Sequence, residues 1–506
     1  MNMLYSISFF AALVLLAVWF FNKNNTRVIK FIPSLLGLSL MAYAGSVVFA
    51  SADIPDKLWT AFRDMMVLGG ASAAFLFFSR SKMTFLPVLL VSLLLYMWYN
   101  GNIMSHTFDS KAADIPVADE AELLVEINEN NSIADLKEIM DKYGLEVGRA
   151  FYPEDEAATE LDDYYTVNIP ESLEHKRAEI TKALKKSGFI DWVEVNEEIN
   201  IDPMPAKKLP EVNKKFRLND PGVQHLWGFE AMNMDQLYTY LEKNKIKPKK
   251  KALVAILDTG VDAEHEDLKG NFKSIEDQYN NDPQGHGTHC AGIAGAVSNN
   301  NKGTASYSRD NSFYQVSSIK VLNANGMGTQ QSIVSGMLKA ADKGADVISL
   351  SLGGPSNQSR QRAYKKAVAY ANKKGAIVVV AAGNSNRNAK NYSPANAPGV
   401  IAVSAVDNTL NRAVFSNYVQ DIDMGIAAPG VNIYSTIPGS KYASYNGTSM
   451  ATPYVSGLVG LMKSIKPELT TKEAYKLLKN NGINTKTTKY TGKFIQPAKT
   501  VEALTK

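Results

Sequence analysis

A serine hydroxyl that could act as a nucleophile lies at the start of an apolar run. Ser449 belongs to Gly447-Thr448-Ser449-Met450-Ala451-Thr452-Pro453, just before the helix-compatible run from Tyr454 to Ile465. Small neighbours let another backbone approach the hydroxyl, and a helix beginning here would direct free N–H groups and its positive dipole end toward it. Taken alone, Ser449 fits a helix N-cap equally well, so other residues must decide its role.

Two further side chains complete a set that nucleophilic catalysis needs. Asp258 follows the apolar strand Leu253–Leu257, and His286 begins a second helix within Gly285-His286-Gly287-Thr288-His289-Cys290-Ala291-Gly292. A serine nucleophile requires a base that takes its proton and an acid that orients this base. The chain order Asp, His, Ser is one of the orders in which this geometry occurs on an α/β sheet.

The elements that must position these residues alternate between strands and helices from Ala252 onward. Helices are predicted over Thr329–Lys343 and Arg360–Lys374. Continuous apolar strands are predicted over Leu253–Leu257, Val316–Val321, Val347–Leu352, Ile377–Ala381 and Val400–Val403. Such strands are typical of a buried parallel sheet. The pattern predicts a doubly wound, mostly parallel α/β domain whose functional residues lie at the carboxyl ends of strands.

Five motifs, in order and spacing, resemble the subtilisin-like serine proteases, or subtilases. They are Asp258-Thr259-Gly260-Val261, the His286 segment, Ser351-Leu352-Gly353-Gly354, Ala381-Ala382-Gly383-Asn384 and the Ser449 segment. The resemblance extends roughly from Pro221 to Gly482. It implies a serine endopeptidase that forms an acyl-enzyme. Ser449 would be the nucleophile, His286 the general base and then acid, and Asp258 the orienting carboxylate.

The resemblance also implies how a polypeptide substrate is held. Asn384 would be the side-chain donor of the oxyanion hole, beside the Ser449 backbone N–H. Ser351, Leu352 and Gly353 would form one binding edge, which pairs with the substrate as an added strand. Together with Ala381, Ala382 and Gly383, they would also form the walls of the pocket for the residue before the cleaved bond. Gly326 and Gly328 resemble the opposing edge, where glycine lets a second backbone come close.

A structural calcium site is a further implication of the family. The matching residues are Asp220, Asp267, Val297, Asn300, Lys302 and Thr304. Asp220, Asp267 and Asn300 would bind through their side chains and the other three through backbone carbonyls. Hard oxygen ligands of this kind suit Ca²⁺. Lys302 departs from the small polar residue common in the family, although only its carbonyl would coordinate the ion.

Cys290, the single cysteine of the chain, excludes an intramolecular disulfide. It follows His286 by one helical turn, and a buried core residue is the favoured interpretation.

The first hundred residues are predicted to form a membrane region. Four apolar runs extend over Leu4–Phe21, Ile29–Ala50, Ala61–Ser79 and Met83–Tyr99. A helix that crosses a bilayer needs about 20 residues, so residues 1–100 favour about four such helices, followed by a linker over 101–114. Basic residues gather in the first and third loops, which the positive-inside rule places in the cytoplasm. Everything after Asn100 is then expected to be extracytoplasmic.

Residues 115–205, here called the acidic segment, have the α+β pattern β-α-β-β-α-β, which is ferredoxin-like. The predicted elements are Glu122–Asn128, Ser132–Tyr143, Tyr164–Ile169, Glu171–Ser187, and the closing strands Trp192–Val195 and Ile199–Ile201. By pattern and position the segment resembles the inhibitory propeptide of the subtilases. A linker and processing region is expected over 206–218, and the catalytic domain over 219–506.

Charge divides sharply between these two parts. Residues 112–205 contain 8 Lys and Arg against 24 Asp and Glu, whereas residues 206–506 contain 38 against 22, so the net charges are −16 and +16. Opposite charges of this size favour mutual attraction, although two independently soluble domains would also show them. The expected partners are polypeptide substrates, the propeptide and the lipid bilayer, and nucleic acid is not expected.

Three alternatives compete with an anchored protease. A metallohydrolase could use His265, His286 and His289, but the H-E-x-x-H motif is absent. A catalytically inactive, membrane-tethered peptide-binding protein could use the same fold, although no triad residue is missing. The membrane region could also have a role of its own in sensing or transport, but its spans are poor in charge and anchoring is the simpler interpretation.

Overall fold

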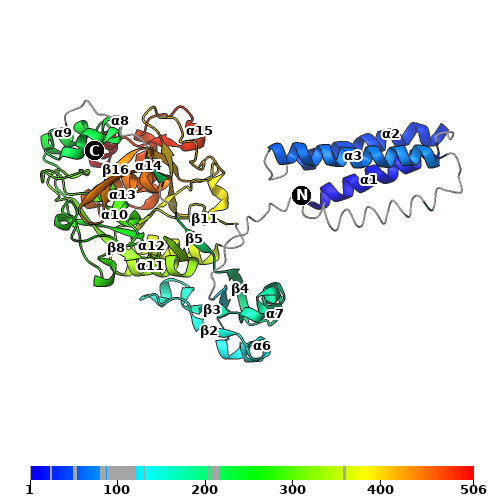
Figure 1. Ribbon diagram of the computed structural model, residues 1–506, viewed down its shortest axis with the longest axis horizontal. Helices are drawn as coiled ribbons and strands as arrows, with labels where there is room; N and C mark the ends of the chain where they lie inside the picture. The colour runs from blue at the N-terminus through cyan, green and yellow to red at the C-terminus, as the bar shows by residue number, and fades with distance from the viewer. Residues whose placement is uncertain are drawn as a thin grey trace. The chain divides into compact units, whose positions relative to one another are not determined.

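Seven parallel strands form the central sheet of the computed structural model (Figure 1). The structure describes residues 2–22, 26–48, 54–79, 87, 121–129, 131–201, 204–206, 216–356 and 361–506. The strand order is β18-β15-β14-β12-β10-β7-β8, and every neighbouring pair is parallel. The strands are β7 (Ala252–Asp258), β8 (Tyr314–Lys320), β10 (Val347–Leu350), β12 (Ile377–Ala381), β14 (Val400–Val406), β15 (Gly425–Pro429) and β18 (Lys493–Phe494). The predicted parallel sheet is therefore confirmed.

Helices cover both faces of this sheet, which explains why its strands are apolar without interruption. In β7, Val254 and Ile256 pack on the side of α10 (His286–Gly295) and α13 (Thr448–Ile465). Ala255 and Leu257 point the other way, toward α11 (Gln330–Asp342) and α12 (Arg362–Lys373). Successive side chains of a strand point to opposite faces, so a sheet buried on both sides needs apolar residues at every position.

Shorter elements complete this domain. They are α8 (Trp227–Ala231), α9 (Met234–Lys243), β9 (Met327–Thr329), β11 (Gly354–Pro355), β13 (Tyr392–Ser393), β16 (Ile433–Ile437), β17 (Lys441–Asn446), α14 (Thr471–Asn481), α15 (Thr488–Thr491) and α16 (Pro497–Thr505). β16 and β17 form an antiparallel hairpin, and β9 and β17 each pair with a short strand from residues 198–205.

The acidic segment has its own four-stranded antiparallel sheet with the order β2-β3-β1-β4. Along the chain the elements are β1 (Leu123–Ile127), α6 (Lys137–Tyr143), β2 (Glu146–Arg149), β3 (Tyr164–Asn168), α7 (Arg177–Lys186) and β4 (Ile190–Val195). The prediction that Ile199–Ile201 closes this sheet is wrong. Residues Glu198–Asn200 form β5, which pairs with β9 instead, and Ile199 and Ile201 are buried in the core beside α11.

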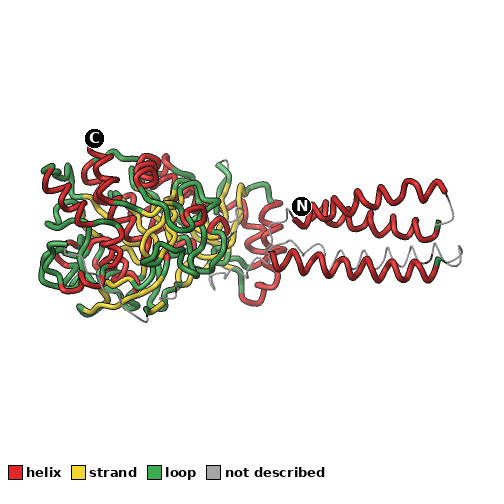
Figure 2. The backbone as a smooth tube through the Cα atoms, turned by 90° about the horizontal axis from the view of Figure 1, so that it is seen from above, coloured by secondary structure: helices red, strands yellow, loops and turns green. Residues whose placement is uncertain are grey.

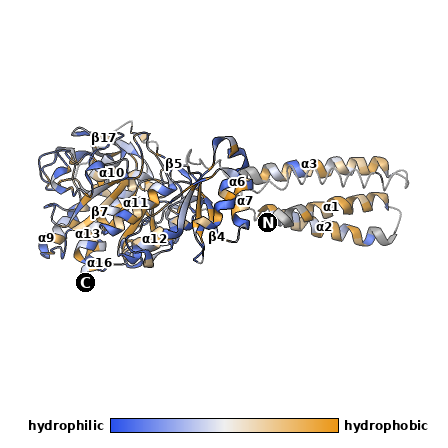
Figure 3. Cartoon of the chain, turned by 90° about the horizontal axis from the view of Figure 1, so that it is seen from below, coloured by the Kyte–Doolittle hydropathy of each residue, from blue (hydrophilic) through white to orange (hydrophobic). Residues whose placement is uncertain are grey.

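Residues 1–114 form a separate compact unit. Its helices are α1 (Asn2–Phe21), α2 (Thr26–Val48) and α3 (Ile54–Phe78), which run side by side (Figure 2). Figure 3 shows that hydrophobic residues predominate along them. Two stretches, Lys30–Val48 and Thr60–Phe78, are long and apolar enough to cross a membrane by length and composition, and Ile7–Phe21 is shorter. The fourth predicted span, Met83–Tyr99, lies outside the described residues.

Candidate active site

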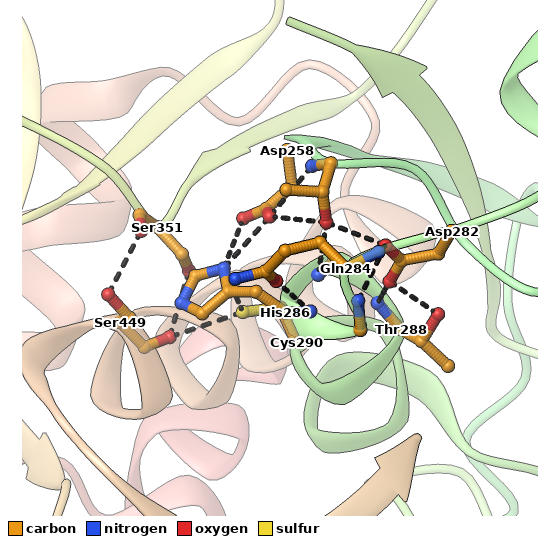
Figure 4. A network of polar contacts seen from close by, with 11 residues as sticks. Asp258, Asp282, Gln284, His286, Thr288, Cys290, Ser351 and Ser449 are labelled. Atoms are coloured by element: carbon orange, nitrogen blue, oxygen red, sulfur yellow. Dashed lines mark hydrogen bonds and ion pairs between the residues drawn. The ribbon is translucent and has the colours of Figure 1, made fainter. Parts of the chain in front are cut away.

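Asp258, His286 and Ser449 come together from three elements at the carboxyl ends of the sheet strands. Asp258 ends β7, His286 begins α10, and Ser449 lies in the first turn of α13. Nδ1 of His286 lies 2.8 and 2.9 Å from the two carboxylate oxygens of Asp258. Figure 4 shows the imidazole between Asp258 and Ser449. The three residues predicted from sequence thus form one constellation.

Close backbone packing fixes the position of His286. Gly285 precedes α10 with a φ of 102°, a conformation that favours glycine. A Cβ on Gly287 would lie 2.0 Å from the carbonyl oxygen of Gly260, directly after Asp258 and Thr259 in the chain. The start of α10 is therefore held against the end of β7, and this contact sets the distance between the histidine and the aspartate.

Asp282, which was not predicted from the sequence, anchors the same helix start. Its buried carboxylate accepts hydrogen bonds from the backbone N–H groups of Gly285 and Thr288, both at 2.8 Å. It also accepts from the hydroxyl groups of Thr259 and Thr288 at 2.8 and 2.7 Å. An acid just before a helix start is a recognisable capping signal. Asp282 therefore positions His286 without touching it.

The electrostatics suit a general base. Burial alone would lower the pKa of His286, but the adjacent Asp258 carboxylate opposes this and raises the pKa well above its ordinary value of 6.5. The carboxylate favours the imidazolium that forms when the histidine takes a proton. Ser449 Oγ donates a hydrogen bond of 2.9 Å to the carbonyl oxygen of Ser351, at the edge of the sheet.

Cys290 packs behind the triad as a buried, free thiol. Its Sγ lies 3.5 Å from the carbonyl oxygen of Ser449 and 4.0 Å from Nδ1 of His286. Burial raises the pKa of this thiol, so it stays protonated and is a poor nucleophile. The predicted role as a core residue is consistent with these contacts.

The Asn384 side chain is oriented by Thr448. Its Oδ1 accepts from the backbone N–H of Thr448 at 2.9 Å and from its hydroxyl at 2.8 Å. With the oxygen engaged, Nδ2 is the group left to donate into the cleft that Asn384 lines together with Ser449. Sequence reasoning found Asn384 but missed Thr448, whose partner is 64 residues away.

The cleft in front of Ser449 has a volume of about 390 Å³. Leu352, Gly353, Ala381 and Gly383, all predicted from sequence, line it. Ser351 contacts the nucleophile segment directly, since its hydroxyl donates to the carbonyl oxygen of Ser449 at 2.8 Å. Ala382 lies further back, fully buried, with its N–H bonded to Val403. Gly326 and Gly328 lie on the opposing edge, where they contact β5.

The chain's own residues 198–201 and 204–206 lie along this cleft. Glu198, Asn200, Ile201 and Met204 are part of its lining. On one side β5 pairs antiparallel with β9, and the Ile201 N–H donates to Gly326 O at 3.0 Å. On the other side β6 (Met204–Pro205) pairs with β17, and the Ala206 N–H donates to Ser444 O at 2.8 Å. These two pairings lie on either side of the cleft that contains Ser449.

The six residues predicted to bind calcium share one loop region. Asp220 and Asp267 are buried carboxylates, and burial raises the pKa of Asp267 to about 7. Asp267 accepts from Asn300 Nδ2 at 2.8 Å and from Thr304 N at 2.7 Å, while its carbonyl accepts from Val297 N at 2.8 Å. The Lys302 N–H donates to Asn300 Oδ1, and its ammonium turns outward to Glu266 at 3.1 Å.

The three histidines of the metallohydrolase alternative do not converge. His265 Nε2 bonds to the carbonyl of Lys441, and His289 Nε2 bonds to that of Ala443. Among the described residues, one group of three side chains could together hold a metal ion, and it consists of Asp258, His286 and Cys290. Since the first two are already paired as base and orienting acid, the geometry favours a serine nucleophile.

A buried Asp–His pair beside a serine at a helix start, on a parallel α/β sheet, defines a serine hydrolase with the chain order Asp, His, Ser. Residues 249–496 match the Subtilase family. The chain is 48% identical over 218 residues to thermitase of Thermoactinomyces vulgaris, covering 42% of this chain and 75% of that protein. It is 44% identical over 248 residues to subtilisin DY of Bacillus licheniformis, covering 47% and 86%.

A third relative matches more of the chain. The thermostable alkaline protease of Halalkalibacterium halodurans is 36% identical over 332 residues, which covers 63% of this chain and 82% of that protein. The matched part of this chain is longer than residues 219–506, so the match extends into residues before 219. The chain belongs to the subtilase family and is a serine endopeptidase of the subtilisin type.

Proposed function

We propose that this chain is a membrane-anchored endopeptidase made as a self-inhibited, self-processing precursor, with residues 115–205 as its propeptide. The observation that carries the proposal is the position of residues 198–201 and 204–206, which pair with both sides of the cleft. An extended chain in this place occupies the position of a substrate. The longer match to the alkaline protease, which must extend upstream of residue 219, also supports a propeptide.

Ion pairs supply a reason for the propeptide to stay bound. Glu126, only 3% exposed, lies 2.7 Å from Lys366 and 3.0 Å from Arg362 of α12. At the periphery, Lys343 lies 3.4 Å from Glu154, and Lys374 lies 3.4 Å from Asp155. The opposite charges of the two parts thus meet along α11 and α12. We infer that the cut propeptide remains attached and keeps the catalytic domain at the membrane.

We infer that each residue of the site takes part in one step of peptide hydrolysis. Ser449 Oγ forms a bond to the substrate carbonyl carbon while Nε2 of His286 takes its proton. Asn384 Nδ2 and the Ser449 N–H stabilise the oxyanion. The C–N bond then breaks, and the departing amine takes the proton from His286. Water repeats these steps on the acyl-enzyme. Asp258 orients the histidine and stabilises its charged form throughout.

We propose that α2 and α3 cross the bilayer and that α1 and the run Met83–Tyr99 add further spans. The apolar stretches Lys30–Val48 and Thr60–Phe78 support this proposal by length and composition. The basic residues Lys23 and Arg27 precede the first stretch, which itself begins at Lys30, and Arg80 and Lys82 follow the second. Positive loops on the cytoplasmic side would leave the catalytic domain outside.

We further propose that Ca²⁺ binds between Asp220 and Asp267. Two buried carboxylates, with no cationic side chain paired to either among the described residues, form a donor set that fits a divalent ion, and Asn300 lies against both. Its amide nitrogen donates to Asp267 and its oxygen accepts from the Lys302 N–H, so coordination by the Asn300 oxygen would require both of these hydrogen bonds to be given up. When bound, the ion would neutralise the two carboxylates and tie the loop of residues 297–304 to the domain.

Labelling with a fluorophosphonate probe and N-terminal mass analysis test the proposed function together. The full-length protein should yield a labelled fragment whose N-terminus lies between residues 203 and 219. Ser449→Ala should abolish both the labelling and the processing, because both need the nucleophile. Processed but unlabelled protein would favour the inactive peptide-binding alternative. Labelled protein that keeps its original N-terminus would contradict self-processing alone.

A further inference from the structure

The propeptide contacts the catalytic domain at a point well away from the triad. The Glu194 carboxylate, at the end of β4, accepts hydrogen bonds from the backbone N–H groups of Arg362 and Ala363, both at 3.0 Å. It also accepts from Gln330 Nε2 at 3.2 Å. These donors belong to the first turns of α12 and α11, and Glu194 is only 3% exposed. A carboxylate from outside the catalytic domain therefore accepts hydrogen bonds at the N-termini of two of its helices, α11 and α12.

The helix α12 depends on this external carboxylate for its cap. Its N-cap residue is Gln361, whose side chain makes no capping bond. Both amide atoms of Gln361 are buried and have no hydrogen-bond partner among the described residues. By contrast, α11 is capped by its own Thr329. The N–H groups at the start of a helix have no partner within the helix, and here Glu194 satisfies two of those of α12.

From Glu194 the chain follows one continuous course into the cleft. Asn196 Oδ1 accepts from the Gln331 N–H at 3.1 Å, and the Glu197 carbonyl accepts from the Gln330 N–H at 2.8 Å. The Glu197 carboxylate accepts from the Ser356 hydroxyl at 2.8 Å. Then β5 pairs with β9, and Ile201 reaches Gly326 O. The carboxylate site at Glu194 thus lies seven positions upstream of Ile201, which bonds to the edge of the cleft.

All of these donors belong to the catalytic domain and stay with it when the propeptide leaves. The helix dipole adds positive character at the same place, and the Arg362 side chain, which lies 3.0 Å from Glu126, adds a positive charge to the first turn of α12. A polypeptide that binds the cleft in the register of β5 would direct its upstream residues over the two helix starts. The occupant that this course favours is therefore the N-terminal part of a long substrate.

We propose that the starts of α11 and α12 form an exosite for acidic substrates. It would select polypeptides with a carboxylate seven residues before the residue that bonds Gly326 O. This inference rests on the proposed protease function and names its substrate class. Peptides too short to reach the helices would be cut without this selection.

The test uses the catalytic domain of the processed full-length chain, separated from the propeptide at about 1 M salt so that the starts of α11 and α12 are free, and three fluorogenic peptides with one common cleavage sequence. One peptide ends shortly before the cleft, one is extended upstream with Glu at the proposed position, and one carries Gln there. We expect kcat/KM to be at least tenfold higher for the Glu peptide than for the Gln peptide. Moving the Glu by two residues should remove the gain.

A matched pair of variants locates the effect on the protein. Arg362→Glu places a negative charge at the start of α12 and should bring the Glu-to-Gln ratio close to one. Lys373→Glu makes the same charge change at the other end of the helix and should keep the ratio. Each ratio compares two peptides on the same variant, so it does not depend on how fast that variant cuts the short peptide.

The outcomes separate the two proposals. A ratio near one in the wild-type enzyme, with the short peptide cut normally, overturns the exosite and leaves the protease function intact. Failure to cut even the short peptide overturns the protease function instead. If Arg362→Glu does not fold, the position-shifted peptides on the wild-type enzyme still decide the question.

Discussion

At the scale of single residues, the pairing of His286 with Asp258 sets the pH dependence. The carboxylate raises the pKa of His286 well above 6.5, and only the neutral imidazole can take the proton of Ser449. Activity is therefore lost as the pH falls through this raised pKa. We expect kcat/KM of the processed enzyme to decrease about tenfold per pH unit below an inflection above pH 6.5.

Replacing Asp258 by Asn is the matching control for that profile. Without the carboxylate the pKa of His286 should fall, so the inflection should move to lower pH. The rate should also decrease by about 10⁴, the loss known for the equivalent change in another Ser–His–Asp protease. A wild-type profile that stays flat to pH 4 would contradict the assignment of His286 as the base.

The residues proposed to do the chemistry could be predicted because each lies in a short motif. Asp258, His286, Asn384 and Ser449 are all recognisable in this way. The residues that hold them were not, because their partners are distant in sequence. Thr448 orients an amide 64 residues away, and motif reading does not show which hydroxyl an amide will meet. Asp282 acts within six residues, so its capping pattern before Gly285 could have revealed it.

At the scale of elements, the calcium proposal predicts a chelator effect. Removing Ca²⁺ with EGTA should lower the unfolding temperature, because an ion that binds only the folded state at 100 times its Kd contributes about 2.7 kcal/mol. Asp267→Asn should lower it similarly and remove the response to EGTA. Glu266→Gln, beside it in the chain but paired with Lys302, should behave as wild type. An unchanged melting curve with EGTA would exclude a structural ion.

A second stability prediction concerns Lys463, a buried lysine in the largely apolar helix α13. Lys463 is buried at 2% exposure, and its ammonium donates to the carbonyls of Gly375, Pro467 and Leu469. Lys463→Met keeps the stem but leaves buried carbonyls unpaired, at about 1–3 kcal/mol for each group.

Melting of the Ser449→Ala protein, which cannot digest itself, is the measurement for this prediction. Lys466→Met, on an exposed side chain of the same region, should change the unfolding temperature little. A Lys463→Met protein as stable as its parent would show that the three carbonyls find other donors.

Sequence patterns identified most strands but not always their partners. A strand was predicted over Ile199–Ile201, where the structure has β5 (Glu198–Asn200), but it was assigned to the sheet of the acidic segment. Alternation gives the two faces of a strand and carries no information about which edge it joins. Here Ile199 and Ile201 find apolar partners beside α11, so the strand pairs with β9 and leaves its own sheet with four members.

At the scale of the whole molecule, the ion pairs predict a salt-dependent release. After processing, the catalytic domain should stay in the membrane fraction at low ionic strength and leave it at about 1 M salt, where screening extends only to about 3 Å. Exposed pairs contribute little, but Glu126 is nearly buried between Arg362 and Lys366.

Lys366→Glu should therefore release the domain already at low salt, and sedimentation followed by immunoblotting would measure it. Lys489→Glu, which makes the same charge change outside this interface, should leave attachment unchanged. Complete release of the wild-type domain at low salt would show that the charges do not hold the two parts together.

The placement of residues 198–201 and 204–206 along the cleft has a consequence for dilution. Under the proposed self-processing, inhibitor and cleft are one molecule before the cut, and a short tether keeps the local concentration of the inhibitor near the millimolar range. Diluting the precursor cannot empty the cleft. After the cut the same contacts become a complex of two molecules that dissociates when its concentration falls below Kd. A single peptide bond thus converts a concentration-independent restraint into one that weakens wherever the enzyme is sparse.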